Sequence, residues 1–146
     1  IDSVSNLGSG ITVSNSYAID TLRPMVVIRI VENALGDGVG NYGSGNSNKS
    51  LVTFTFSEAP LNFVKNDISV ANGTLGRLVK DDSTHYHATF TADNDFAGKG
   101  SVTVDATKFT DVASNDNPAA TPAFVAIDTL RSTITASLDS ADGHIR

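Results

Sequence analysis

The chain has 146 residues, of which 40% are hydrophobic and 7% aromatic, and it contains neither cysteine nor tryptophan. Its formal charge of −6 excludes the basic footprint that a nucleic acid or an anionic membrane requires. The absence of cysteine excludes disulfides, thiolate metal sites and cysteine nucleophiles. No apolar run reaches membrane-spanning length, so membrane insertion is not expected. We expect a domain whose core is built mostly from Val, Ile, Leu and Phe.

Alternation of apolar and polar residues predicts β-strands along most of the chain. In Leu51–Glu58, for example, Val52, Phe54 and Phe56 face one way while the threonines between them face the other. Turn residues such as Asn72 and Gly73 separate the strands. Seven short strands with such spacing predict an all-β fold, an immunoglobulin-like β-sandwich of about seven strands. In chain order the predicted strands are Met25–Val31, Leu51–Glu58, Ile68–Val70, Leu75–Val79, His85–Phe90, Ser101–Ala106 and Ala123–Ile127. The stretch Gly36–Ser50, rich in Gly, Asn and Ser, predicts a long loop.

The hexapeptide Ala-Ile-Asp-Thr-Leu-Arg occurs twice, at Ala18–Arg23 and at Ala126–Arg131, 108 residues apart. The segments upstream of the two copies, Asp2–Asn6 and Asp111–Asn115, are also alike. Such self-similarity is typical of a tandem array. We therefore predict that residues 1–20 end a preceding repeat, 21–128 form one complete Ig-like repeat and 129–146 begin the next. The expected partners are neighbouring repeats of the same chain, with no specific small-molecule ligand.

Several sequence words in a fixed order carry a family resemblance. VTFTFSEAP is followed by ANGTL, YHATFTAD, GSVTVDA, FTDVASND and finally AIDT. In this order the chain resembles the bacterial Ig-like repeats in the extender region of giant Bap-like and RTX surface adhesins, which include biofilm proteins. The resemblance implies an extracellular repeat at the bacterial cell surface that extends the adhesin, with calcium stiffening the junctions. One departure is Ser114, where the family often has Gly.

Acidic and amide side chains are predicted to gather at both ends of the sandwich, because consecutive loops of up-and-down strands fall at alternating ends. Carboxylate and amide oxygens are the ligands that Ca²⁺ prefers, six to eight of them at about 2.3–2.6 Å. Acids in turns can also simply cap and solvate loops. The sequence together with the resemblance predicts structural Ca²⁺. Its candidate ligands are Asp20, Glu58, Asp67, Asp111 and Asn115 at the N-terminal end, and Asp37 and Asp128 at the C-terminal end.

Other site chemistries find less support in the sequence. His85 and His87 have a spacing that can bind zinc, but no third ligand is evident, and two solvent-facing strand residues would give the same pattern. There is no G-x-S-x-G motif, and paired acids such as Asp81 and Asp82 are commonly solvated turn residues. We therefore do not expect an enzyme.

Two alternatives to an extender repeat are a calcium-dependent carbohydrate-binding module and a homotypic cell-adhesion module. A sugar platform usually needs an exposed aromatic ring, and only Tyr42 is expected to be free, since Tyr86 should point inward with Phe90. Homotypic adhesion would use exposed edge strands, for which the sequence offers no partner-specific signal.

Overall fold

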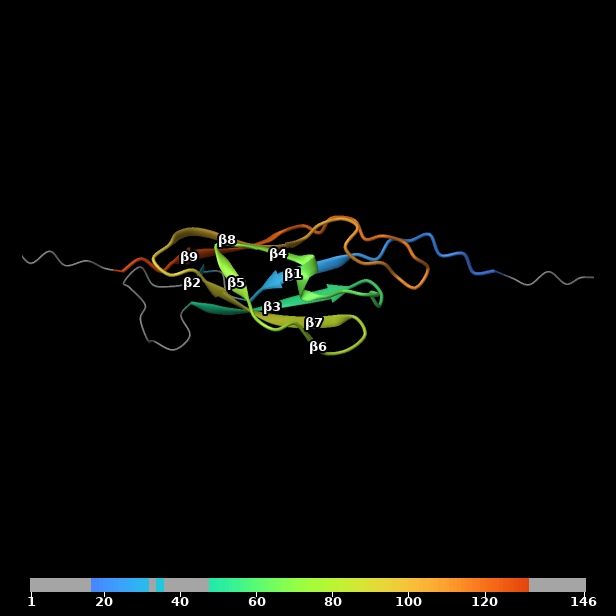
Figure 1. The fold of residues 1–146 in the computed structure, drawn as a ribbon, viewed down its shortest axis with the longest axis horizontal. Helices are drawn as coiled ribbons and strands as arrows, with labels where there is room; N and C mark the ends of the chain where they lie inside the picture. Colours follow the sequence, from blue (N-terminus) through green and yellow to red (C-terminus); the bar gives the residue numbers. More distant parts are fainter. Residues whose placement is uncertain (1–16, 32–33, 36–47, 132–146) are drawn as a thin grey trace, which may run out of the picture.

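The alternating segments of the chain pair into two β-sheets that face each other (Figure 1). The computed structural model describes residues 17–31, 34–35 and 48–131. The predicted fold class, an Ig-like β-sandwich, is confirmed. Within the described residues the one helical element is the short 3-10 turn η1 (Lys65–Asp67). No helix in this part of the chain is long and apolar enough to cross a membrane.

The first sheet has the order β1-β3-β7-β5, with β6 also paired to β7. The second has the order β2-β9-β8-β4. All pairs are antiparallel except β2 with β9, which is parallel. The first sheet therefore has five strands and the second has four, and together they form the two-sheet arrangement of an Ig-like sandwich. The strands are β1 (Val26–Ile30), β2 (Ala34–Leu35), β3 (Lys49–Phe56), β4 (Ile68–Ala71), β5 (Gly73–Leu75), β6 (Val79–Lys80), β7 (His85–Ala92), β8 (Ala97–Val104) and β9 (Ala123–Asp128).

The strand prediction was wrong in several details. The strand β3 begins at Lys49, inside the predicted loop Gly36–Ser50, and β8 runs from Ala97 to Val104 rather than from Ser101 to Ala106. The predicted strand Leu75–Val79 is divided into β5 and β6. The register explains this, because Leu75 lies opposite Phe90 and Val79 opposite His87, so this side has one residue more than β7. An extra residue interrupts a ladder in the manner of a β-bulge. The short strand β2 was also not predicted.

The core lies between the sheets and follows the predicted alternation. Val52 and Phe54 on β3, Phe90 on β7 and Val102 on β8 are fully buried. On β9, Val125 is buried while Phe124 is 60% exposed. Burial of one face of β1, β3, β7, β8 and β9, at roughly 25 cal/mol per Å² of apolar surface, holds the two sheets together.

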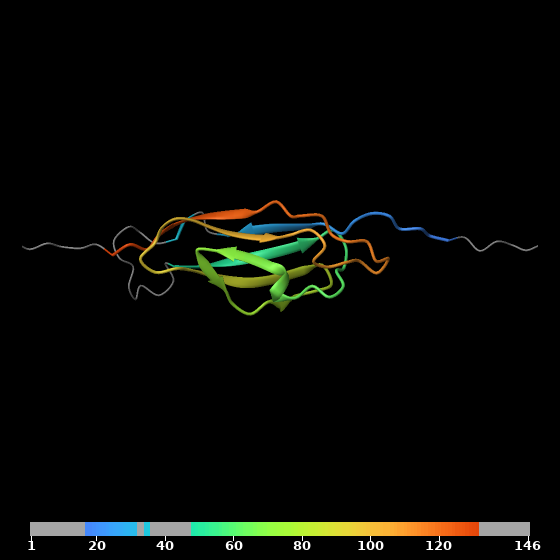
Figure 2. The same ribbon diagram turned by 45° about the horizontal axis from the view of Figure 1, so that its top comes forward.

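The chain enters and leaves the sandwich at opposite ends. Figures 1 and 2 show the described N-terminal segment in blue at one end of the long axis and the described C-terminal segment in red at the other. The β8–β9 connection, drawn in orange, lies beside the N-terminal segment. The two copies of the repeated hexapeptide therefore lie at opposite ends of the domain.

Candidate cation-binding site at the N-terminal end

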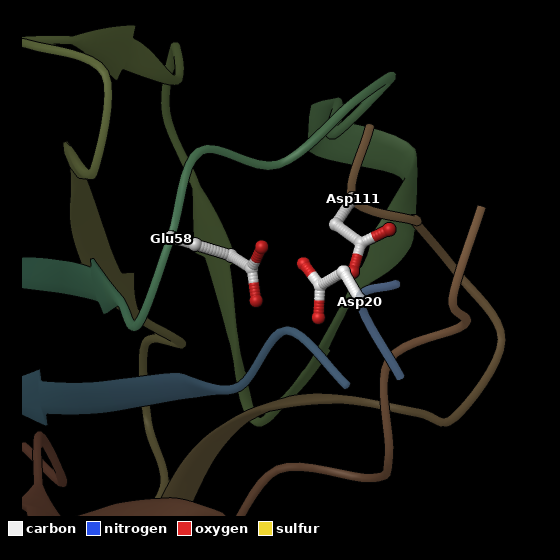
Figure 3. Close-up of side chains that lie close together, drawn as sticks. All are labelled: Asp20, Glu58 and Asp111. Atoms are coloured by element: carbon white, nitrogen blue, oxygen red, sulfur yellow. The ribbon is translucent and has the colours of Figure 1, made fainter. Parts of the chain in front are cut away.

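Three carboxylates converge where the chain enters the sandwich (Figure 3). Each of Asp20, Glu58 and Asp111 offers an oxygen that lies within 4.8 Å of the others. They come from three separate segments: the N-terminal arm, the bend after β3 and the β8–β9 connection. Asp111 is buried, Glu58 is half-buried and Asp20 is exposed. Two of the three acids thus lie on the domain itself, and the third lies on the exposed N-terminal arm.

Aromatic packing beneath the group sets its geometry. Phe56 lies two residues before Glu58, and Phe109 lies two residues before Asp111. The two rings meet edge to face with centroids 5.2 Å apart, and Phe63 packs against both. Edge-to-face pairs contribute about 0.5–1.5 kcal/mol beyond their area burial. This apolar contact brings the two acids together despite their like charge.

Asn115 holds the Asp111 carboxylate in place with two hydrogen bonds. Its Oδ1 accepts a hydrogen bond from the Asn115 backbone N–H at 2.9 Å, and its Oδ2 accepts one from the Asn115 side-chain amide at 2.8 Å. Burial alone would raise the pKa of Asp111, but the hydrogen bonds from Asn115 and from the Ala113 backbone leave that pKa below its usual value. Asp111 is therefore held as a carboxylate.

Ser114, within the same turn, has φ of 69°, in the left-handed region that favours glycine. Glycine adopts this conformation without a steric penalty, so Ser114 carries a backbone strain that glycine would not.

A buried asparagine that the sequence pattern does not mark as a site residue organises the loop that carries Asp111. The Asn117 side chain is fully buried. Its oxygen accepts from the backbone N–H groups of Lys108 and Phe109 at 2.6 and 2.9 Å. Its nitrogen donates to the carbonyls of Asp105 and Pro118 at 2.8 Å each. Asn117 satisfies four backbone groups of an irregular segment that could not otherwise be buried without cost.

The N-terminal arm is tied to this loop through its backbone and one arginine. The Asn115 amide donates to the Asp20 carbonyl at 3.0 Å, and Arg23 Nε donates to the Asp116 carbonyl at 2.7 Å. The Asp20 carboxylate accepts from the Leu22 backbone N–H at 3.0 Å, which forms a local turn. Pro24, directly after the arm, is fully buried. These contacts orient Asp20 toward the other two acids.

Glu58 is the acid of this group whose pKa is raised by burial and by the charges of its two neighbours. Burial, followed by the charges of Asp111 and Asp20, raises the pKa of Glu58. Two unit charges about 5 Å apart repel by about 1 kcal/mol in water and about 3 kcal/mol at an effective dielectric constant near 20. A divalent cation among the carboxylates would replace this repulsion with attraction.

The remaining predicted ligands lie elsewhere or play other parts. The Asn115 amide nitrogen donates both to the Asp20 backbone carbonyl and to the Asp111 carboxylate, so this side chain links the two residues through its nitrogen. Asp67 accepts a hydrogen bond from the Val64 backbone N–H at 2.8 Å and so caps η1, and it is not in the group of three. Asp128 ends β9 at the opposite end of the domain and is exposed. Asp37 lies outside the described residues, as do Tyr42 and the predicted flanks before residue 17 and after residue 131.

The two histidines of β7 are each paired with a carboxylate of the preceding turn. Nδ1 of His85 lies 2.8 Å from Asp82, and Nδ1 of His87 lies 2.8 Å from Asp81. The Thr84 backbone N–H and then His85 lower the pKa of Asp82. Among the described residues neither histidine joins a group of three potential metal ligands. The acids of this turn are thus partners of the histidines rather than purely solvated residues.

The exposed rings differ in part from the expectation that only Tyr42 is free. Tyr86 is buried, as predicted, whereas Tyr17 is 82% exposed, and Phe124 is 60% exposed because alternation along β9 turns it outward. Lys99 Nζ lies over this ring, 5.8 Å from its centroid. A hollow of about 310 Å³ lies between β1 and residues 118–122, and no aromatic ring lines it. In the described part of the chain, neither Tyr17 nor Phe124 stacks with another ring to form a sugar platform.

Comparison with known families adds the identity of the fold. The family model described as bacterial Ig-like domain matches residues 20–127, nearly three quarters of the chain. This chain belongs to the bacterial Ig-like domain family. The match begins at Asp20, the arm residue of the acidic group, and ends within β9. Bacterial Ig-like domains are generally structural, non-catalytic modules, typically of extracellular or surface proteins. A search of curated proteins found no match.

Proposed function

We propose that this bacterial Ig-like domain is a structural extender repeat of a large bacterial cell-surface adhesin. Its task would be to project a distal binding domain away from the cell. The observation that carries this proposal is the position of the repeated hexapeptide: one copy enters at one end of the sandwich and the other leaves at the opposite end. Copies joined through this hexapeptide would be stacked end to end, which maximises length per residue.

The adhesin type and the domain division belong to the same proposal. The order of the sequence words supports a Bap-like or RTX-type repeat in an extracellular setting. The 108-residue spacing of the hexapeptides supports a complete repeat at 21–128, with parts of neighbouring repeats at 1–20 and 129–146. The neighbours of this repeat in the same chain would be its partners.

Calcium is proposed as the structural ion of the junction. Asp20, Glu58 and Asp111 would supply carboxylate oxygens, and backbone carbonyls and water would complete the six to eight ligands that Ca²⁺ takes. Asp20 lies on the arm and the other two acids lie on the domain. An ion between them would therefore fix the arm to the domain and rigidify the junction.

The test is thermal unfolding of the 146-residue chain in millimolar Ca²⁺ and in chelator. An ion that binds only the native state stabilises it by about 2.7 kcal/mol at a hundredfold excess over Kd. We expect a clear rise in Tm with calcium for the natural chain and a much smaller rise for Glu58→Gln. Asp95→Asn makes the same charge change at the opposite end, where Asp95 is exposed. This control should keep the full calcium response.

Equal melting temperatures in calcium and chelator would contradict the calcium proposal for this chain. A response lost equally in Glu58→Gln and in Asp95→Asn would place the ion elsewhere. A glycan-array hit that is specific and reproducible would favour the carbohydrate-binding alternative over the extender.

A further inference from the structure

The N-terminal arm exposes large apolar side chains to an unusual degree. Tyr17 is 82% exposed and Ile19 is 81% exposed, the highest values among the exposed large hydrophobic residues of the described chain. They are separated by Ala18 and followed by Asp20, so apolar and small or polar residues alternate. Alternation of this kind is that of a strand with one buried face.

The second copy of the hexapeptide shows what such a segment does when it is packed. At the 108-residue spacing, Tyr17 corresponds to Val125, Ile19 to Ile127 and Thr21 to Thr129. Val125 and Ile127 point into the core from β9 and are 1% and 3% exposed. The exposed apolar positions of the arm therefore correspond to core positions of the final strand.

The threonine of the hexapeptide makes the correspondence more specific. Thr129 is 4% exposed, its backbone N–H donates to the Phe96 carbonyl at 2.8 Å, and its hydroxyl accepts from the Phe96 N–H at 3.1 Å. The same hydroxyl donates to the Asp93 carbonyl. Thr21 carries the same side chain but is exposed.

We infer that Tyr17–Thr21 is the final strand of a preceding copy of this domain, so that one hexapeptide serves two domains at once. The inference rests on the proposed tandem array and specifies its joint. Ile19 and Thr21 would pack on the β7–β8 corner and β8 of the domain before. Asp20 points to the other side of the strand, toward Glu58 and Asp111 of the domain after. Consecutive strand residues face opposite ways, which permits this division of roles without any linker.

The surface that covers the exposed arm is thus that of a preceding copy of the same fold, and a second, separate chain does not offer this surface. In a free chain, the position along β8 that the arm would fill is taken by that chain's own β9, which pairs with β8 from Ala97 to Val102.

The experiment begins with the 146-residue chain and uses the two threonines as a matched pair. Thr129→Val keeps the shape of the side chain but leaves the Phe96 N–H and the Asp93 carbonyl without their partner. We expect Tm to fall by about 5–10 °C, the scale for losing two buried hydrogen bonds in a domain of this size. Thr21→Val should leave Tm unchanged within error.

The decisive step is a fusion in which residues 1–128 are joined directly to residues 21–146. The joint then reads Ala126-Ile127-Asp128-Thr21-Leu22-Arg23, a single hexapeptide between two complete domains. Here Thr21→Val at the joint should lower the Tm of the first domain as Thr129→Val does in the single chain. The same substitution at the free N-terminal arm of the fusion should have no effect. Amide hydrogen exchange gives a second readout: the joint threonine N–H should exchange slowly, like that of Thr129.

A joint variant that melts like its parent, or a joint N–H that exchanges as fast as that of Thr21 in the single chain, would overturn the inference. These outcomes are independent of calcium, so they are distinguishable from a failure of the proposed ion. Slow exchange at the joint without any calcium response would uphold the shared strand and reject the ion.

Discussion

Replacing Asn117 by alanine should remove most of the order of the loop that carries Asp111. The side chain makes four hydrogen bonds to backbone groups, and all four would lose their partner in a buried place. A typical intramolecular hydrogen bond contributes about 1 kcal/mol net, and an abandoned buried group costs about 1–3 kcal/mol. We expect a loss of about 4 kcal/mol, a large part of the 5–15 kcal/mol total stability of an ordinary domain.

Differential scanning calorimetry at neutral pH measures this loss. At about 4 °C per kcal/mol for a domain of this size, Tm should fall by about 15 °C. Asn66→Ala is the control, because Asn66 lies exposed in η1. The Asn117 variant should also respond less to calcium, because Asp111 would no longer be positioned. A fall in Tm of less than about 3 °C would refute the argument that Asn117 supports the loop.

Three further predictions concern the acids, the turn and the core. In chelator, Glu58→Gln should raise Tm at about pH 7 and have no effect at about pH 3.5. The raised pKa of Glu58 means that the neutral side chain stabilises the fold below the unfolded pKa of 4.5, and this stabilisation is lost as pH rises through the folded pKa. A higher Tm for the variant at both pH values would contradict the raised pKa of Glu58. Ser114→Gly should raise the free energy of unfolding in urea by about 0.5–1 kcal/mol, because glycine adopts the left-handed φ of this position without strain. Ser69→Gly, in the extended strand β4, should lower it. Two changes of the same sign would contradict the strain at Ser114. Gly100→Ala should lower the free energy of unfolding by about 1–3 kcal/mol, because the new Cβ would meet the Phe90 ring at 2.6 Å and Ile127 Cδ1 at 2.8 Å. Gly76→Ala, whose Cβ would have its nearest neighbour at 3.4 Å, should lower it clearly less. Equal urea midpoints for the two variants would show that the core has room for the methyl group.

The strands that the sequence predicted well are those with one fully buried face. In β3 and β7, every second residue is buried, so the local pattern alone reveals both the strand and its inward side. The division into β5 and β6 depends on the register against β7, and the short β2 depends on its parallel pairing with β9. Both are properties of a partner far along the chain, which a local pattern does not contain.

The candidate site could be predicted only in outline. Alternating strand direction was enough to expect Glu58, Asp111 and Asp20 at one end of the domain. It could not separate them from Asp67, whose carboxylate is engaged by the backbone of η1. Asn117 was missed because an asparagine in a turn-rich segment is usually a solvated residue, and its burial follows from how the β8–β9 connection folds over Phe109.

We propose that this domain extends an array through a stiff joint that a bound ion closes. Small-angle X-ray scattering of the two-domain fusion, in millimolar Ca²⁺ and in chelator, tests it most directly. We predict an extended, rigid particle in calcium and a smaller mean radius of gyration with a broader distance distribution in chelator. Glu58→Gln in the second copy, which faces the joint, should give the chelator profile in both conditions. Identical profiles of the natural fusion with and without calcium, or a compact side-by-side pair of domains, would contradict the claim.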